Sequence, residues 1–427
     1  MALLAWSMSA ASTVQRVVVT GIGLLSPLGL TRQASFERLI RAESAIRPAA
    51  PEITRWLPQV LSADVDPAYA QQLDRNEQGL DRATQFALLA SREALADARA
   101  AEWDLAPERI GVFAGIGLGG ATTGEALYTR MSEQLQAGRN PTVMHPLSVP
   151  RLMPNAATAA ISMAHQLRGP THTYSVACSS SAMALGEAYR NIRHGYADAI
   201  VVVGAEAMNV PGVFMAWNAL RVMAKPHPGN PAASCRPFDQ DRSGFVLGEG
   251  AAALVLETAD SALRRGATIY GEICGYGSSS DARHLTQPSS EGQYRALRMA
   301  LDESGIAPAG IHYLNAHGTA TEAGDVVESE TIRQVFGDHA DRLPVSSTKA
   351  QHGHLIGAAG ATEFAISLLA MQSGSIPPTA FLDKTDPRCT LDYVPRQARH
   401  GQSLQAVMSN SFAFGGSNVS LIARRYA

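Results

Sequence analysis

Short apolar runs that end in glycine or another small residue recur along the first part of the chain, and each is followed by a stretch with helical spacing. The runs are rich in β-branched residues and alternate with the helical stretches. This alternation predicts an α/β fold whose strands are buried on both faces. The runs are RVVVTGIGLLSPLG, RIGVFAGIGLGG, THTYSVACSS, ADAIVVVGAEA and GAAALVLE.

The same order of strand, glycine turn and helix begins again after the fifth run, in ATIYGEICGYGSSSD, GIHYLNAHGTAT, LPVSSTKAQHGHLIGAAG and LQAVMSNSFAFGGSN. We therefore expect a duplicated fold with halves at residues 16–265 and 266–427, preceded by a loose leader at residues 1–15. Two stretches without a clear period, Met131 to Pro154 and Pro211 to Gly244, are expected to be irregular loops.

The composition is that of a compact protein with a lightly charged surface. Of 427 residues, 46% are hydrophobic and 17% are charged, and the formal net charge is -3. Such a charge gives no general attraction to nucleic acid or anionic lipid, so neither partner is expected. No segment reaches the roughly 18 apolar residues of a membrane span.

The cysteines and the N-terminus favour a cytoplasmic protein. Cys178, Cys235, Cys274 and Cys389 are far apart and form no CxxC pair, which argues against a disulfide framework or a zinc site. The N-terminal MALLAWSMSAAS lacks the basic and long apolar regions of a secretion signal.

Cys178 lies where a predicted strand, HTYSV, meets a predicted helix, AMALGEAYRNIRHG. Ala177 to Ser180 should therefore form the turn, with the thiol at the helix N-terminus. The helix dipole and free N–H groups there lower the pKa of a thiol and bind a developing oxyanion. Free cysteines are also commonly buried and unreactive, so this stretch alone leaves a nucleophile and an inert core residue equally open.

A first histidine lies in NAHGTATEAGD, on a turn after a predicted strand. His317 is followed by Thr319 and Thr321, whose hydroxyls suit a polar extended ligand. A structural histidine is the plain alternative. The segment lacks the lysine and the glycine spacing of a nucleotide-binding loop.

A second polar cluster lies in SSTKAQHGHLIGAAG, where Lys349 precedes His352 and His354. No carboxylate or third ligand stands nearby, so no metal site is expected. In SNSFAFGGSN, Phe412 and Phe414 lie on a glycine-rich turn, where the rings either line a pocket or pack in the core.

Together these stretches supply what carbon–carbon bond formation between thioesters requires. A thiolate captures the acyl group covalently. Decarboxylation of a malonyl thioester then needs donors to the enolate oxygen, and two neutral imidazoles with a proton on Nε2 provide them.

In these residues the chain resembles the β-ketoacyl-acyl carrier protein synthases, condensing enzymes of the thiolase superfamily, and is most similar to their type II, elongating group. The resemblance covers nearly the whole chain. It rests on several motifs in order: VVVTGIGLLSPLG, RGPTHTYSVACSSS, RPFDQDRSGFVLGEGAAALVLE, NAHGTATEAGD, SSTKAQHGHLIGAAGA and SNSFAFGGSN.

The resemblance implies a thiolase-like duplicated fold of five layers, α-β-α-β-α, and a homodimer, with a heterodimer with a ketosynthase-like partner as the other possibility. It makes Cys178 the nucleophile and His317 and His354 the decarboxylation pair, with Lys349 as a supporting cation paired with Glu363. Acyl carrier protein delivers the acyl and malonyl groups on its phosphopantetheine arm, so no separate cofactor is expected.

The resemblance also assigns the surroundings of the thiol. The backbone N–H groups of Cys178 and Phe414 match the family's oxyanion hole, and Phe414 matches its gate between the acyl and malonyl steps. Thr319 and Thr321 match residues that contact the pantetheine arm.

Four further residues are expected at the substrate and partner sites. Ile116 matches a position that lines the acyl pocket near the dimer interface, and Phe412 is expected to contact substrate. Arg221 matches a contact to the carrier protein, and Lys225 extends this basic site.

Four positions depart from the family pattern: Val176 replaces Thr, Glu322 replaces Pro, Ala350 replaces Ser and Ala413 replaces Gly. None removes a catalytic group. The alanine stiffens the gate and the glutamate changes the charge beside the threonines, which suits an enzyme of a specialised polyene, polyyne or polyketide pathway rather than a housekeeping one.

Three other functions are open at this point. A non-catalytic partner of the chain-length-factor kind typically lacks the cysteine, which is present here. A degradative thiolase needs a second cysteine in the C-terminal glycine loop, where SNSFAFGGSN has none. A cysteine hydrolase shares a Cys-His pair without the two-half arrangement.

Overall fold

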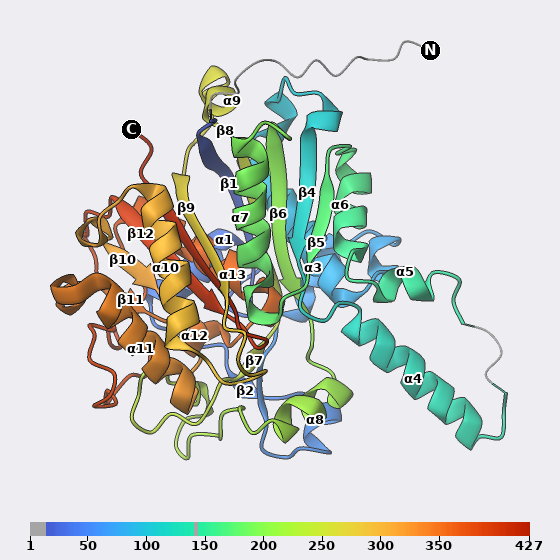
Figure 1. The fold of residues 1–427 in the computed structure, drawn as a ribbon. Coiled ribbons are helices and arrows are strands. Elements are labelled where there is room, and N and C mark those ends of the chain that lie inside the picture. The colour runs from blue at the N-terminus through green and yellow to red at the C-terminus, as the bar shows by residue number, and fades with distance from the viewer. Residues whose placement is uncertain (1–13, 141–143) are drawn as a thin grey trace, which may run out of the picture.

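The computed structural model describes residues 14–140 and 144–427 (Figure 1). Most of the expected leader, residues 1–13, lies outside the described residues. The strands are β1 (Val17–Leu25), β2 (Arg47–Pro48), β3 (Leu61–Ala63), β4 (Ile110–Gly115), β5 (Thr171–Tyr174), β6 (Ala199–Glu206), β7 (Leu247–Gly248), β8 (Gly250–Thr258), β9 (Gly271–Ser280), β10 (Tyr313–Asn315), β11 (Val345–Ser346), β12 (Ala406–Phe412) and β13 (Ser417–Arg424).

The helices are α1 (Arg32–Ile40), α2 (Pro51–Thr54), α3 (Arg82–Asp97), α4 (Ala121–Gln136), α5 (Ser148–Leu152), α6 (Ala156–His165), α7 (Ser180–Arg193), α8 (Pro211–Ala219), α9 (Ala259–Arg264), α10 (Ser290–Ser304), α11 (Glu322–Phe336), α12 (Lys349–His352) and α13 (Ala359–Ser373). Within the described ranges, no helix is long and apolar enough to cross a bilayer.

The main sheet repeats one strand order in its two halves. Its order is β11-β10-β12-β13-β9-β1-β8-β6-β4-β5, and a short antiparallel pairing of β9 with β1 joins the halves. In each half the second strand of the half pairs in parallel with two neighbours, β4 with β5 and β6, and β10 with β11 and β12. The duplication expected from the sequence is therefore present, while the boundary at residues 265 and 266 stays a prediction.

Helices α7 and α13 form the central layer of the molecule (Figure 1). Both contact strands of the two halves of the sheet. Helix α3 packs with α6 on the outer face of the first half, and α10 packs with α11 outside the second half. Each helical layer has its own apolar core. The five-layer α-β-α-β-α fold expected for this chain is confirmed.

The two central helices begin in the same way. A 3₁₀ turn precedes each, Ala177–Ser179 before α7 and Ile356–Ala358 before α13. Each turn starts with a residue in the left-handed region, Ala177 with φ +50° and Ile356 with φ +45°. The backbone N–H of Ala361 in α13 donates to the hydroxyl of Ser181 in α7 at 2.9 Å. The N-termini of both helices therefore meet at one place, beside Cys178.

The two stretches expected to be irregular contain helices, and this expectation was wrong in part. Helix α4 extends to Gln136, α5 covers Ser148–Leu152, and α8 starts with Pro211 at its first position. The second half of α4 is rich in residues with high helix propensity, although it also contains Thr129 and Ser132. None of its residues is buried, although Leu127, Met131 and Leu135 recur at helical spacing, so the sequence did carry a signal for this helix.

Candidate active site

Cys178 lies in the turn between β5 and α7, as the sequence predicts. Its side chain is 5% exposed. The backbone N–H groups of Phe414 and of Cys178 itself are directed at the thiol and lower its pKa. These two N–H groups are positioned to hold a negative oxygen on a carbonyl attached to the sulfur.

The predicted lowering of the thiol pKa is wrong for the free protein. Burial raises the pKa of Cys178 to about 12, because it outweighs the opposing effects of the Lys349 cation and the two N–H groups. The helix terminus favours a thiolate as predicted, but the enclosed site removes the water that stabilises it. Formation of the thiolate therefore depends on stabilisation by the N–H group of His354, 3.0 Å from the sulfur, and by the bound substrate.

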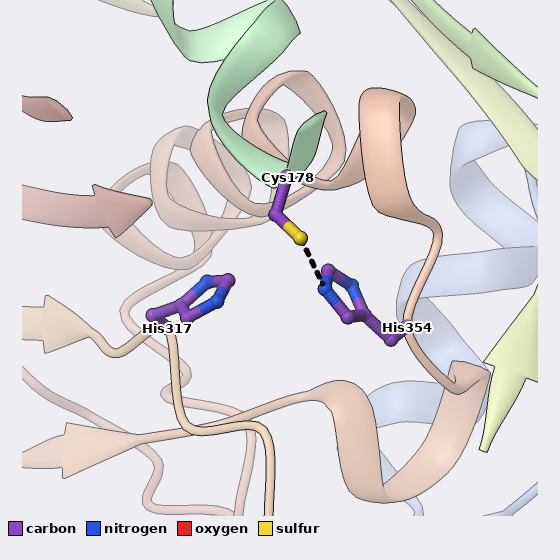
Figure 2. Close-up of side chains that lie close together, drawn as sticks. All are labelled: Cys178, His317 and His354. Carbon is purple, nitrogen blue, oxygen red and sulfur yellow. Dashed lines mark hydrogen bonds between the residues drawn. The ribbon is translucent and has the colours of Figure 1, made fainter. Parts of the chain in front are cut away.

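His354 lies against the thiol, with Nε2 at 3.0 Å from Sγ of Cys178 (Figure 2). Its Nδ1 accepts the backbone N–H of Ile356 at 3.3 Å, so the proton of the neutral ring is on Nε2. Burial, Lys349 and His352 hold the pKa of His354 well below its usual value. A neutral imidazole with an N–H directed at sulfur stabilises a thiolate.

His317 lies on the other side of the thiol from His354 (Figure 2). The ring centroids of His317 and His354 are 5.4 Å apart. Nζ of Lys349 lies 3.5 Å from Nδ1 of His317, and an ammonium group can only donate, so the proton of this ring is also on Nε2. Burial, Lys349 and His354 lower the pKa of His317 far below its usual value.

Lys349 and Glu363 form a buried ion pair behind His317, as the resemblance implies. Nζ of Lys349 also donates to the backbone oxygen of His317 at 2.6 Å. Burial raises the pKa of Glu363 to about 7 although Lys349 lowers it. The pair fixes the cation that keeps both histidines neutral.

The donor atoms of Cys178, His317 and His354 all lie within 4.8 Å of one another, a spacing that also suits a metal ion. The cation of Lys349 beside His317 opposes a second cation there. His352, the other histidine considered as a ligand, bonds through its ring nitrogens to the backbone oxygen of Gly353 at 2.8 Å and the Thr348 hydroxyl at 2.9 Å. The residues present therefore fit organic thioester chemistry better than metal binding.

A cavity of about 360 Å³ leads from the surface to the thiol. The hydroxyls of Thr319 and Thr321 lie 3.0 Å apart along it. The cavity brings together eight of the predicted site residues, which are Cys178, Arg221, His317, Thr319, Thr321, His354, Phe412 and Phe414.

Four predicted residues do not line this cavity: Lys349 and Glu363, which form the buried ion pair behind His317, and Ile116 and Lys225. Ile116 is buried in the apolar core of the first half, and Lys225 is exposed and does not reach the cavity. The roles proposed for them in acyl and carrier-protein binding stay predictions.

In the turn that contains Phe412 and Phe414, the positive φ angles lie at Gly415 and Gly416 and not at Ala413. Gly415 and Gly416 have φ +85° and +79°, whereas Ala413 lies outside the left-handed region. The Ala413 N–H donates to the Ser417 oxygen at 2.9 Å across the turn. Phe414 stacks on Trp217 with centroids 6.0 Å apart, so this departure from the family pattern imposes no backbone strain.

Two buried residues of the site escaped the sequence analysis. The Glu328 carboxylate accepts the backbone N–H groups of His317 and Gly318 at 2.8 Å each. Arg242 donates to the backbone oxygens of Thr321 and Glu322 at 3.0 and 2.7 Å. Both hold the histidine–threonine turn. Only Arg242 had a signal, because it lies in the motif RPFDQDRSG.

A buried cysteine between two neutral imidazoles, in the middle of a duplicated α/β fold, is the arrangement that an acyl-transferring condensing enzyme requires. Family models agree: "Beta-ketoacyl synthase, N-terminal domain" matches residues 14–262 and "Beta-ketoacyl synthase, C-terminal domain" matches residues 270–383. The chain therefore belongs to the β-ketoacyl synthase family.

Individual relatives match nearly the full length. The 3-oxoacyl-[acyl-carrier-protein] synthase 2 of Synechocystis sp. is 38% identical over 420 residues, which are 96% of this chain and 98% of that protein. The crystal structure of a β-ketoacyl synthase from Burkholderia phymatum gives a TM-score of 0.87 at 36% identity, covering 97% of this chain and 100% of that one. The ishigamide ketosynthase/chain length factor gives 0.85 at 33% identity with the same coverage.

Proposed function

We propose that this condensing enzyme joins an acyl group, carried on Cys178, to the two-carbon unit of malonyl-carrier protein. In the first step the sulfur of Cys178 attacks the acyl thioester, and the N–H groups of Cys178 and Phe414 hold the oxyanion. The bond to the pantetheine sulfur breaks, and that sulfur leaves with the thiol proton. The proximity of Nε2 of His354 to Sγ, 3.0 Å, is the observation that carries this step.

In the second step malonyl-carrier protein loses carbon dioxide. The Nε2–H groups of His317 and His354 donate to the enolate oxygen that forms. The enolate carbon then attacks the acyl-Cys178 carbonyl, the carbon–sulfur bond breaks, and Cys178 recovers a proton from solvent. The strong lowering of both pKa values keeps these rings neutral, and with the proton on Nε2 each neutral ring can donate in this way.

Acylation of Cys178 is tested by incubating the purified protein with acyl-loaded carrier protein and measuring intact mass. Wild type should gain the mass of one acyl group, and Cys178→Ala should gain none. Equal acylation of the variant would exclude this nucleophile.

The division of labour between the two steps is tested with His317→Ala. This variant should still accept the acyl group on Cys178, because the hydrogen bond to Sγ comes from His354. It should release little carbon dioxide and form little ketoacyl product. Loss of acylation with decarboxylation intact would contradict the assigned role.

The partners follow from the same chemistry. The proposed substrate is an acyl carrier protein, whose pantetheine arm passes Thr319 and Thr321 and whose surface meets Arg221 and Lys225. Arg221 is exposed and lines the mouth of the cavity, which supports this placement. No cofactor beyond the carried pantetheine is used.

We further propose a dimer, as homodimer or with a ketosynthase-like subunit, in the cytoplasm. The second possibility is suggested by the ishigamide relative, whose name includes a chain length factor. This chain keeps the donor atoms of Cys178, His317 and His354 within 4.8 Å of one another, so in such a pair it is proposed as the catalytic subunit.

Glu322, 83% exposed at the cavity mouth, supports a specialised acyl chain as substrate.

A further inference from the structure

Glu206 is a buried carboxylate that the proposed mechanism does not use. It ends β6 and is 1% exposed. Its Oε2 accepts the backbone N–H of Gly117 at 2.8 Å and that of Gly357 at 3.0 Å, and Oε1 lies 3.4 Å from the N–H of Leu118. Among the described residues no cation pairs with it. A buried acid held only by backbone N–H groups is costly to ionise, so its position calls for an explanation.

The two glycines allow the carboxylate to approach two separate segments. A Cβ on Gly357 would lie 2.2 Å from the backbone nitrogen of Gly117 and 2.7 Å from Oε2 of Glu206, and a Cβ on Gly117 would overlap the same oxygen. Gly117 follows β4 directly after Ile116, and Gly357 lies in the turn before α13. Glu206 therefore joins the wall of the predicted acyl pocket to the turn that follows His354.

The turn after His354 needs such support because Ile356 adopts an unfavourable conformation. A β-branched residue with φ +45° is a genuine outlier. This conformation directs the Ile356 N–H at Nδ1 of His354, 3.3 Å away. The next peptide N–H, that of Gly357, is the one that Glu206 accepts.

We infer that Glu206 is a positioning residue for His354. By holding the Gly357 N–H it maintains the strained Ile356 turn, and the Ile356 N–H in turn keeps the proton of His354 on Nε2, facing Cys178. Without this bond the turn relaxes, Nδ1 loses its donor and both ring tautomers become populated. The catalytic consequence of this inference rests on the proposed function. The tautomer of His354 follows from the hydrogen bonds alone and does not depend on that function.

The geometry predicts which substitutions are tolerated. In Glu206→Gln the side-chain oxygen can still accept both glycine N–H groups, because Oε2 alone makes these two bonds. In Glu206→Ala neither bond remains. Gly357→Ala should also break the bond to Glu206, since its methyl group would overlap the backbone nitrogen of Gly117 and press on Oε2 of Glu206, and both segments would have to move apart.

The first test is the tautomer, read from the ¹⁵N chemical shifts of His354 in histidine-labelled protein. Wild type and Glu206→Gln should show the proton on Nε2, and Glu206→Ala and Gly357→Ala should show a mixture with the proton on Nδ1. A wild-type pattern in Glu206→Ala would overturn the inference. This outcome is readable even if the protein proves unable to condense thioesters, so failure of the inference and failure of the proposed function are distinguishable.

The second test is decarboxylation of malonyl-carrier protein. The kcat of Glu206→Ala should fall about tenfold or more, the effect of losing one or two hydrogen bonds that hold a catalytic group, with KM within about twofold of wild type. Glu206→Gln should restore most of the rate.

Glu257→Gln is the matched control for general destabilisation. Glu257 is a buried carboxylate that accepts the Thr20 hydroxyl and pairs with Arg265. It lies at the C-terminal end of β8, whereas Glu206 pairs with Gly250 at the N-terminal end of this strand. It should lower stability without changing the His354 tautomer or kcat. If Glu257→Gln and Glu206→Ala reduce kcat alike in proportion to lost stability, Glu206 is a structural residue only.

Discussion

The buried thiol of Cys178 illustrates how a single residue responds to opposing influences. It lies at a helix N-terminus, where a lowered pKa is expected, yet burial raises the pKa to about 12. His354 and the oxyanion donors are arranged to stabilise negative charge once a thioester enters. The free enzyme is therefore expected to protect its nucleophile as a thiol.

This protection predicts how Cys178 reacts with iodoacetamide as the pH changes. Because its pKa is raised, the thiolate fraction should grow about tenfold for each pH unit between 6 and 8.5. The alkylation rate, followed by peptide mass spectrometry, should rise accordingly. A plateau below pH 8 would show that the thiol pKa is lowered. The other three cysteines are buried and serve as internal references.

Removing the cation of the Lys349–Glu363 pair should leave a buried carboxyl group without its ion-pair partner. Lys349→Met is expected to lower the free energy of unfolding by about 3 kcal/mol. The pKa of Glu363, raised by burial, should rise further without Lys349. The folded state then holds a proton that the unfolded state releases above pH 4.5, so stability should fall as the pH rises from 4.5 through the folded pKa.

The control for this experiment is Lys349→Met combined with Glu363→Gln, since an amide carries no charge. The double variant should regain part of the stability at pH 8 and show little of the pH dependence. Both are measured by urea unfolding at pH 5 and pH 8. A single variant whose stability is independent of pH would contradict the argument.

At the scale of elements, the junctions of β5 with α7 and of the 3₁₀ turn with α13 determine the site. The first was predictable, because the strand, the small residues and the helical pattern are adjacent in sequence. The hydrogen bonds of Glu206 were not predictable, because they join it to Gly117 and Gly357, which lie 89 and 151 positions away in the sequence. Helix α4 was missed although Leu127, Met131 and Leu135 recur at helical spacing, and α8 was missed because its apolar residues show no clear period.

The left-handed residue before Cys178 gives a test at this scale. Ala177→Gly should raise the free energy of unfolding by about 0.5–1 kcal/mol, since glycine adopts φ +50° without a Cβ penalty. Ala177→Val should lower it. In the regular part of α7, Ala184→Gly should instead cost about 1 kcal/mol. Urea unfolding compares the three. Destabilisation by Ala177→Gly equal to that of Ala184→Gly would exclude strain at this position.

At the scale of the whole molecule, helix α4 exposes large apolar side chains that no other described part of the chain covers. The helix projects from the body (Figure 1), and Tyr128 and Leu135 are 66% and 56% exposed. An apolar surface of this kind supports the proposed dimer. The pattern predicted the α/β class and the duplication, and the family resemblance implied the five layers. The partner of this face was not predictable, because an interface is not marked by periodicity.

Light scattering after size exclusion should therefore give the mass of two chains. Tyr128→Glu combined with Leu135→Glu should shift the protein toward the mass of one chain, because two buried charges oppose association. A monomeric wild type would contradict the homodimer and leave a different subunit as the partner to seek.

The matching turns at Ala177 and Ile356 also explain why a duplicated molecule has one catalytic centre rather than two. If these two residues are equated, the position equivalent to Cys178 in the second half is Gly357. One copy of an ancestral turn carries the nucleophile, and the other carries no side chain and serves as a point of attachment for Glu206. The symmetry of the fold was kept while the chemistry of its two copies diverged, so the second copy now supports the first.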